Sequence, residues 1–93
     1  MTLTPETLLQ RNVNTLEASL NNGLALFDSA LGVYLQVNAG AEAVWSALVM
    51  PKTIAAICAE LMKTFDVSAA ECLADVQELC EDLIRKKLII ISG

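Results

Sequence analysis

Acidic side chains crowd into one short stretch of the sequence, and carboxylates, after histidine, are the usual groups of general acid–base catalysis. The stretch contains four of them: Asp75, Glu78, Glu81 and Asp82. They fall within a segment of helical periodicity, where Glu81–Arg85 and Asp82–Lys86 have the i, i+4 spacing and order of stabilising ion pairs. We therefore interpret these carboxylates as a solvated helix face and not as a catalytic site.

Other side chains suited to catalysis or metal binding are scarce. The sequence has no histidine, which is the commonest general base near neutral pH and the commonest metal ligand. Cys58, Cys72 and Cys80 include no C-x-x-C pair, so they fit reduced thiols buried as small apolar side chains better than disulfides or a zinc site. Neither a G-x-G-x-x-G motif nor a P-loop occurs. We expect no enzymatic activity, no metal and no cofactor.

The composition favours a protein partner over nucleic acid or membrane. The 93 residues, expected to form one domain over 1–93, are 55% hydrophobic with a net charge of −5. Nucleic-acid binding depends on Lys and Arg that neutralise phosphates, and only six are present. No signal peptide and no apolar run of about 18 residues occur, so we expect a cytoplasmic protein without a membrane partner. The high apolar content predicts a surface reserved for a protein or peptide.

The elements that must position such a surface begin with a small sheet. Residues 1–13 carry weak signals and are treated as an N-terminal arm. Residues 15–27 alternate with period two around Asn22-Gly23, a pair that suits a type I′ turn, and therefore predict an antiparallel hairpin. A third strand follows at 33–37, with Val33, Leu35 and Val37 on one face and Tyr34 and Gln36 on the other.

Three helices are expected after the sheet. Asn38 is a favoured cap for a helix that ends before Pro51, and Thr53 is the cap of the second helix. Ser68 and Glu71 have capping-box spacing at the start of the third helix, which runs to about Lys87. Trp45 lies on the apolar face of the first helix and is expected in the core.

The third helix has one apolar stripe more than a core requires. Its first stripe consists of Cys72, Val76, Leu79 and Leu83, and the second consists of Leu73, Cys80 and Ile84 interrupted by Gln77. One explanation is that the second stripe and the edge of the third strand form a site to which an extended peptide adds as a further strand. Equally, the stripe could pack on residues 88–92 or on a second copy of the chain. A winged-helix DNA-binding regulator is disfavoured because the helices expose few basic residues.

Four segments together resemble the PqqD-like family, the precursor-peptide recognition elements of ribosomally made, modified peptides. They are LALFDSALGVYLQVN, GAEAVWSAL, PKTIAAICAELMKTFDVS and CLADVQELCEDLIRKKLI, within residues 13–91. The most specific features are the Asn38–Trp45 spacing, Thr53 after a turn, and residues 65–67. Gly40 and Pro51 are more similar to the stand-alone recognition proteins of lasso-peptide clusters than to those of pyrroloquinoline quinone synthesis.

The resemblance implies an α+β, winged helix-turn-helix-like fold: a three-stranded antiparallel sheet followed by three helices. It also implies no enzymatic activity, and a leader segment of a precursor peptide bound between the third strand and the third helix. The implied peptide-binding residues are Val33, Tyr34, Leu35, Gln36, Leu73, Asp75, Val76, Gln77, Cys80 and Ile84, with Asp75 placed to meet a basic leader residue.

For the partners, the resemblance implies a transglutaminase-like leader protease, followed by a cyclase. The alternative is a peptide chaperone for a radical enzyme of pyrroloquinoline quinone-like synthesis. One residue departs from the family, which usually has a glycine where Lys87 stands. We therefore expect either a longer third helix or a strained Lys87, and the course of residues 88–92 stays open.

Overall fold

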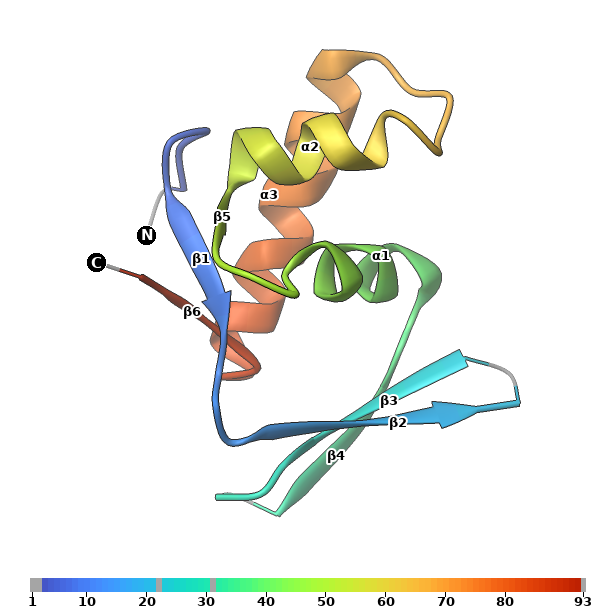
Figure 1. Ribbon diagram of the computed structural model, residues 1–93, viewed down its shortest axis with the longest axis vertical. Helices are drawn as coiled ribbons and strands as arrows, with labels where there is room; N and C mark the ends of the chain where they lie inside the picture. The colour runs from blue at the N-terminus through green and yellow to red at the C-terminus, as the bar shows by residue number, and fades with distance from the viewer. Residues whose placement is uncertain (1–2, 22, 31, 93) are drawn as a thin grey trace.

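The computed structural model describes residues 3–21, 23–30 and 32–92, and only the backbone of Val33. These residues form two small antiparallel sheets and three helices (Figure 1). The first sheet has the order β2-β3-β4: β2 Thr15–Leu20, β3 Gly23–Asp28 and β4 Val33–Val37. The second has the order β5-β1-β6: β5 Lys52–Thr53, β1 Leu8–Arg11 and β6 Ile89–Ile91. The helices are α1 Ala39–Ala47, α2 Ile54–Leu61 and α3 Ala69–Arg85. The expected three-stranded antiparallel sheet followed by three helices is confirmed.

The first sheet is a meander whose turns depend on two glycines. Leu20 pairs with Gly23, which closes the expected hairpin, and Gly23 has φ +141°. Asn22, the other residue of the predicted turn, lies outside the described residues. At the second turn Gly32 has φ +70°, and its N–H donates to the Asp28 carbonyl at 2.8 Å. Both angles are ones that side-chain-bearing residues rarely adopt.

Only part of this sheet is buried. α1 packs against β3 and β4, so Leu24, Leu26 and Val37 belong to the core. A period-two alternation is typical of a half-buried strand, but β2 is not one, because Leu16 is 57% exposed and the other side chains after it are exposed as well. The reason is geometrical: the hairpin projects from the body of the helices, as Figure 1 shows, and an alternating pattern does not reveal whether anything covers the apolar face.

The predicted starts of all three helices are confirmed by their caps. The side-chain oxygen of Asn38 accepts the Ala41 N–H at 2.8 Å. Thr53 and Ser68 accept in the same way from the third residue beyond them, at 3.1 and 3.2 Å. These bonds satisfy backbone donors that have no partner inside the helix.

The expectation that residues 1–13 form an N-terminal arm is corrected for residues 3–11, which are built into the fold. β1 is the central strand of the second sheet, with β5 and β6 on either side. Leu3 and Leu9 are 2% and 0% exposed, so the segment also supplies part of the core. Its local pattern could not predict this, because the pairing strands lie about forty and eighty residues further along the chain.

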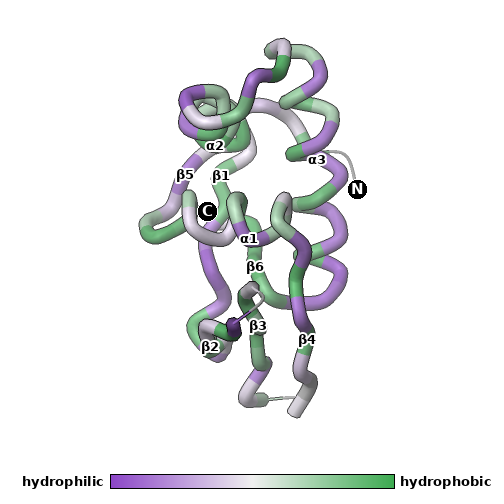
Figure 2. The backbone as a smooth tube through the Cα atoms, turned by 90° about the vertical axis from the view of Figure 1, so that its right-hand side faces the viewer, coloured by the Kyte–Doolittle hydropathy of each residue, from purple (hydrophilic) through white to green (hydrophobic). Residues whose placement is uncertain are grey.

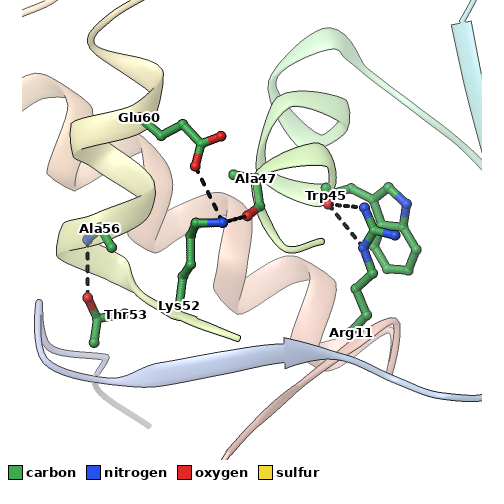
Figure 3. Close-up of polar contacts among 7 residues, drawn as sticks. All are labelled: Arg11, Trp45, Ala47, Lys52, Thr53, Ala56 and Glu60. Atoms are coloured by element: carbon green, nitrogen blue, oxygen red, sulfur yellow. Dashed lines mark hydrogen bonds and ion pairs between the residues drawn. The ribbon is translucent and has the colours of Figure 1, made fainter. Parts of the chain in front are cut away.

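A contact between β1 and α1 fixes the second sheet against the helices (Figure 3). Trp45 is 2% exposed, as expected for a core residue. Nε and Nη2 of Arg11 donate to the Trp45 carbonyl at 3.1 and 2.7 Å, and the guanidinium carbon lies 4.2 Å from the ring centroid. Since this carbonyl lies in the last turn of α1, the arginine both caps the helix and covers its buried tryptophan.

The end of α3 resolves the two possibilities for Lys87. The helix ends at Arg85 and does not run on to Lys87, which has φ +63°. The Lys87 N–H donates to the Ile84 carbonyl at 2.9 Å and the Leu88 N–H to the Leu83 carbonyl at 3.0 Å. This is a Schellman motif with a lysine at the position that glycine usually takes. It turns the chain back so that residues 89–91 form β6.

Within the described residues, no helix combines the length and the apolarity needed to cross a lipid bilayer.

Candidate functional site

β4 forms one edge of the first sheet. Among the described residues it pairs with β3 on one side and with no strand on the other. In an antiparallel pair, alternate residues direct their N–H and C=O groups away from the partner, so β4 offers free donors and acceptors along this edge. The C-terminal strand β6, which could have covered them, pairs with β1 instead.

The side chains of β4 alternate as the sequence predicts. Leu35 is partly buried against the core and Val37 is 8% exposed. Tyr34, 57% exposed, and Gln36 lie on the opposite face. An added strand would therefore have an apolar side toward the helices and a solvated side outward.

A groove of about 80 Å³ lies beside this edge, between β4 and α3. We call it the β4–α3 groove, and it is lined by Leu35, Gln36, Val37, Asn38, Ala41, Leu79, Asp82, Leu83 and Lys86. Figure 2 shows β4 leading upward into α1 alongside the lower turns of α3. Its lining combines apolar side chains, among them Leu83 at 1% exposure, with the charged side chains of Asp82 and Lys86.

A second, more apolar cavity of about 170 Å³ continues along α3; we call it the interhelical pocket. It is lined by Gly40, Ala43, Leu61, Phe65, Val67, Cys72, Asp75, Val76 and Leu79. Leu79 borders both cavities. Gly40 lies against it, and a Cβ added to Gly40 would come within 3.2 Å of Leu79 Cδ1. The missing side chain at Gly40 therefore lets α1 approach α3 at the boundary between the two cavities.

The carboxylates along α3 differ in their pairing. Asp82 accepts from Arg85 at 3.0 Å and from Lys86 at 2.8 Å. The predicted Asp82–Lys86 pair is thus confirmed, whereas Arg85 pairs with Asp82 and not with Glu81. Asp75 is exposed and makes no hydrogen bond or ion pair within the described part of the chain. One cavity is therefore bordered by a paired carboxylate and the other by an unpaired one.

The structure does not bring the predicted second stripe of α3 to β4. Gln77 Nε2 donates to the Leu3 carbonyl at 2.8 Å, so this flank of the helix faces the N-terminal segment. Cys80 is 0% exposed, and Leu73 and Ile84 pack against the core. At about 100° per residue, this flank lies roughly opposite Asp82 and Lys86 on the helix. The stripe is explained by packing within the chain, and a binding role for these four residues stays a prediction.

The remaining predicted residues belong to the edge strand or line the interhelical pocket, and for Val33 the structure describes only the backbone, in β4. Tyr34, Leu35 and Gln36 lie on the edge strand, and Asp75 and the buried Val76 line the interhelical pocket. Sequence reasoning assigned Leu79 and Leu83 to the core and did not place them beside β4. Leu3 and Leu9 are the signal in the sequence that could have indicated this arrangement. Apolar residues in a supposed arm must pack against another element, and the second stripe of α3 is that element.

The three cysteines are free and buried, as expected. The pKa of Cys58 is raised from 9.0 to about 11, mainly by burial and in addition by a hydrogen bond and a charge interaction with Cys72. Burial is also the main reason that the pKa of Cys80 is raised to about 12. The thiols of Cys58 and Cys80 are therefore protonated at neutral pH and poorly nucleophilic. Nowhere in the described ranges do three or more His, Cys, Asp or Glu side chains gather as a metal site would require.

Comparisons with known proteins identify the architecture. Residues 23–89 match the family described as coenzyme PQQ synthesis protein D. Among solved structures, the chain is similar to TbiB1 in complex with the TbiA(beta) leader peptide: the TM-score is 0.80 at 18% identity, over 90% of this chain and 98% of that one. It is also similar to lasso peptide synthetase B1 complexed with the leader peptide, with a TM-score of 0.76 at 20% identity over 88% and 96% of the two chains.

A third solved structure comes from Methylobacterium extorquens. It is the solution structure of the PqqD truncation of PqqCD, described as a functional, stand-alone recognition element for ribosomally synthesised and post-translationally modified peptides. Its TM-score is 0.79 at 17% identity, over 95% of this chain and 94% of that one. None of the curated proteins matches the sequence.

Proposed function

The chain belongs to the PqqD family, and from that premise we propose that it binds the leader segment of a ribosomally synthesised precursor peptide and presents it to a processing enzyme. The observation that carries the proposal is the free edge of β4 beside the β4–α3 groove, whose lining combines leucines with polar side chains. The described chain itself leaves this edge unpaired. Two solved relatives of the same fold are complexes with leader peptides.

The binding mode in this proposal is strand addition. The leader pairs through its backbone with residues 33–36, and its alternate side chains enter the β4–α3 groove against Leu35, Leu79 and Leu83. Backbone hydrogen bonds supply affinity in this mode, and the side-chain cavities supply specificity. Because a disordered leader must be ordered on binding, we expect a Kd between about 10 nM and about 1 μM.

In the proposed mechanism the chain makes and breaks no bond. Holding the leader raises the effective concentration of the attached core peptide near the processing enzyme, which would bind it poorly alone. We propose a leader protease of the transglutaminase-like class as that enzyme, followed by a cyclase. The likeness to the two lasso-peptide proteins supports this choice.

A second candidate enzyme is a radical enzyme of pyrroloquinoline quinone-like synthesis. The family's description and the likeness to the M. extorquens protein favour it. The two candidates differ in what the loaded chain stimulates. Adding this chain should accelerate leader cleavage by the protease in one case and modification of the precursor by the radical enzyme in the other.

The test of leader binding uses labelled 15-residue peptides tiled across each short open reading frame found next to the gene, with binding followed by fluorescence anisotropy. The tightest peptide is then N-methylated at one backbone amide at a time. Strand addition predicts that methylation weakens binding at every second position, since only alternate amides face β4. Equal tolerance at all positions would refute strand addition, and a complete set of peptides without binding would refute the function.

A further inference from the structure

The side of the first sheet that is turned away from the helices is apolar. Directly opposed residues of antiparallel strands lie on the same face of a sheet. The register of the strands therefore places Leu16, Phe27 and Tyr34 side by side in one row across β2, β3 and β4. With the next row and the hairpin end, this surface, which we call the outward face, consists of Leu16, Ala18, Leu20, Ala25, Phe27, Tyr34 and Gln36. None of these side chains carries a charge.

The apolar residues of β2 lie on the uncovered side of the sheet. Leu16 and Tyr34 are each 57% exposed, and Leu20 is exposed as well. The polar side chains of β2 lie on the other face, where Glu17 pairs with Arg11 at 3.4 Å. An antiparallel sheet with one solvated face commonly carries polar side chains on that face. The reversed order on β2 favours contact of the outward face with another molecule.

The size and charge of the outward face argue against a stable homodimer. Its exposed side chains present on the order of 400 Å² of accessible surface, which is in the range of functional patches on monomers. A stable interface covers about 800 Å² on each partner. A second copy would also bring together two chains of net charge −5 through a surface without any compensating charge. The outward face therefore suits a partner that binds transiently.

The outward face ends at the strand to which the leader is proposed to add. Tyr34 and Gln36 belong both to this face and to the free edge strand β4. An added strand lies about 4.8 Å beyond β4, and every second side chain of it extends the same face. The loaded chain therefore presents a larger surface that includes residues of the leader itself. A protein that packs on this surface distinguishes the loaded chain from the empty one.

We propose that the outward face is the docking surface of the processing enzyme and that the bound leader forms part of it. The inference rests on the proposed function and assigns a surface to the partner enzyme. The enzyme packs an uncharged, apolar patch on Leu16, Phe27 and Tyr34, and it contacts every second residue of the leader strand. It binds the loaded chain more tightly than the empty chain, because loading completes the surface.

The test measures binding of the transglutaminase-like protease or the radical enzyme encoded next to the gene to the immobilised chain, by biolayer interferometry. The original protein should bind the enzyme at least threefold more tightly when it is loaded with the tightest-binding tiled peptide. Leu16→Lys places a charge in the outward face, two strands away from the leader. It should weaken enzyme binding at least tenfold, because the charge is desolvated in an apolar contact, and should change the Kd of the leader less than twofold.

Ser19→Lys is the matched control. It places the same charge at an exposed position of the same strand, on the face opposite to Leu16. It should change the Kd of the enzyme and the Kd of the leader less than twofold. Circular dichroism checks that both variants are folded. If Leu16→Lys does not fold, Ala18→Lys takes its place, since Ala18 is an exposed residue of the same face.

Three results would overturn this inference and leave leader binding intact. The first is enzyme binding that Leu16→Lys leaves unchanged or that both variants weaken equally, and the second is equal affinity of the enzyme for the loaded and the empty chain. The third is sedimentation that shows a dimer of the original protein and a monomer of Leu16→Lys, which would assign the outward face to a second copy. If no tiled peptide binds the original protein, the proposed function fails first and this inference fails with it.

Discussion

Replacing Gly40 with alanine should make the protein more stable and a poorer binder. Gly40 lies in the first turn of α1 and its φ is not positive, so alanine fits the backbone. Such a change stabilises a helix by about 0.4–1 kcal/mol, because the unfolded chain loses freedom. The new Cβ would lie 3.2 Å from Leu79 Cδ1, which requires a shift of a few tenths of an ångström. That methyl is the far end of a flexible side chain beside an open cavity of about 170 Å³, so it can move at little cost.

The displaced Leu79 would narrow the passage between the two cavities. We expect the midpoint of urea unfolding to rise by roughly 0.4–1 M, taking an m-value of about 1 kcal/mol/M. The Kd of the leader peptide should rise at least threefold. Ala43→Gly, in the same helix and on the same pocket, is the mirror control: it should lower stability by about 1 kcal/mol and leave the passage open. If Gly40→Ala is destabilised and binds the leader normally, the boundary assigned to Gly40 and Leu79 is wrong.

Three further changes test the framework around the site. Arg11→Met removes two charge-assisted hydrogen bonds and a cation–π contact, so it should cost about 1–3 kcal/mol in urea unfolding followed by the fluorescence of Trp45, and an unchanged midpoint would contradict this. Lys87→Gly relieves a positive φ and should raise stability by about 1 kcal/mol; Lys87→Val should lower it. The pKa values of Cys58 and Cys80 are raised in the folded protein. The contribution of these two thiols to the free energy of unfolding is therefore complete below pH 9 and should be lost as the pH rises through about 11 to 12. Unfolding free energies that stay level from pH 8 to 11.5 would argue against that burial.

Local signals in the sequence predicted the first sheet and the three helices well. Asn38, Thr53 and Ser68 act through neighbours three residues away, so their roles as caps are visible in the sequence. The second sheet was missed because its strands have two to four residues each and pair across long separations. With β1 unassigned, the sequence showed no cover within the chain for the stripe formed by Leu73, Cys80 and Ile84. A peptide site and packing on residues 88–92 or on a second copy therefore stayed open, and the binding role of the stripe is still a prediction.

The alternation of β4 was predicted correctly, and so was its position at an accessible edge of the sheet in the described chain. Which flank of α3 lies beside it was not predictable, because two stripes of similar apolarity run along that helix. Only tertiary contacts distinguish them: Gln77 bonds to Leu3 on one flank, and Leu79 meets Gly40 on the other.

The position of β1 between β5 and β6 also has a consequence for biosynthesis. Leu9 pairs with Ile91, and Arg11 pairs with Ile89. The ribosome therefore synthesises β1 about eighty residues before the strand with which it pairs. Until those residues leave the exit tunnel, Leu9 has no strand partner on one side, and the barrier to closing so long a loop is mainly entropic. We expect the nascent chain to form the β2–β4 meander early. The β1–β6 pair, and with it the packed hydrophobic core, should form only after the β6 segment has been synthesised.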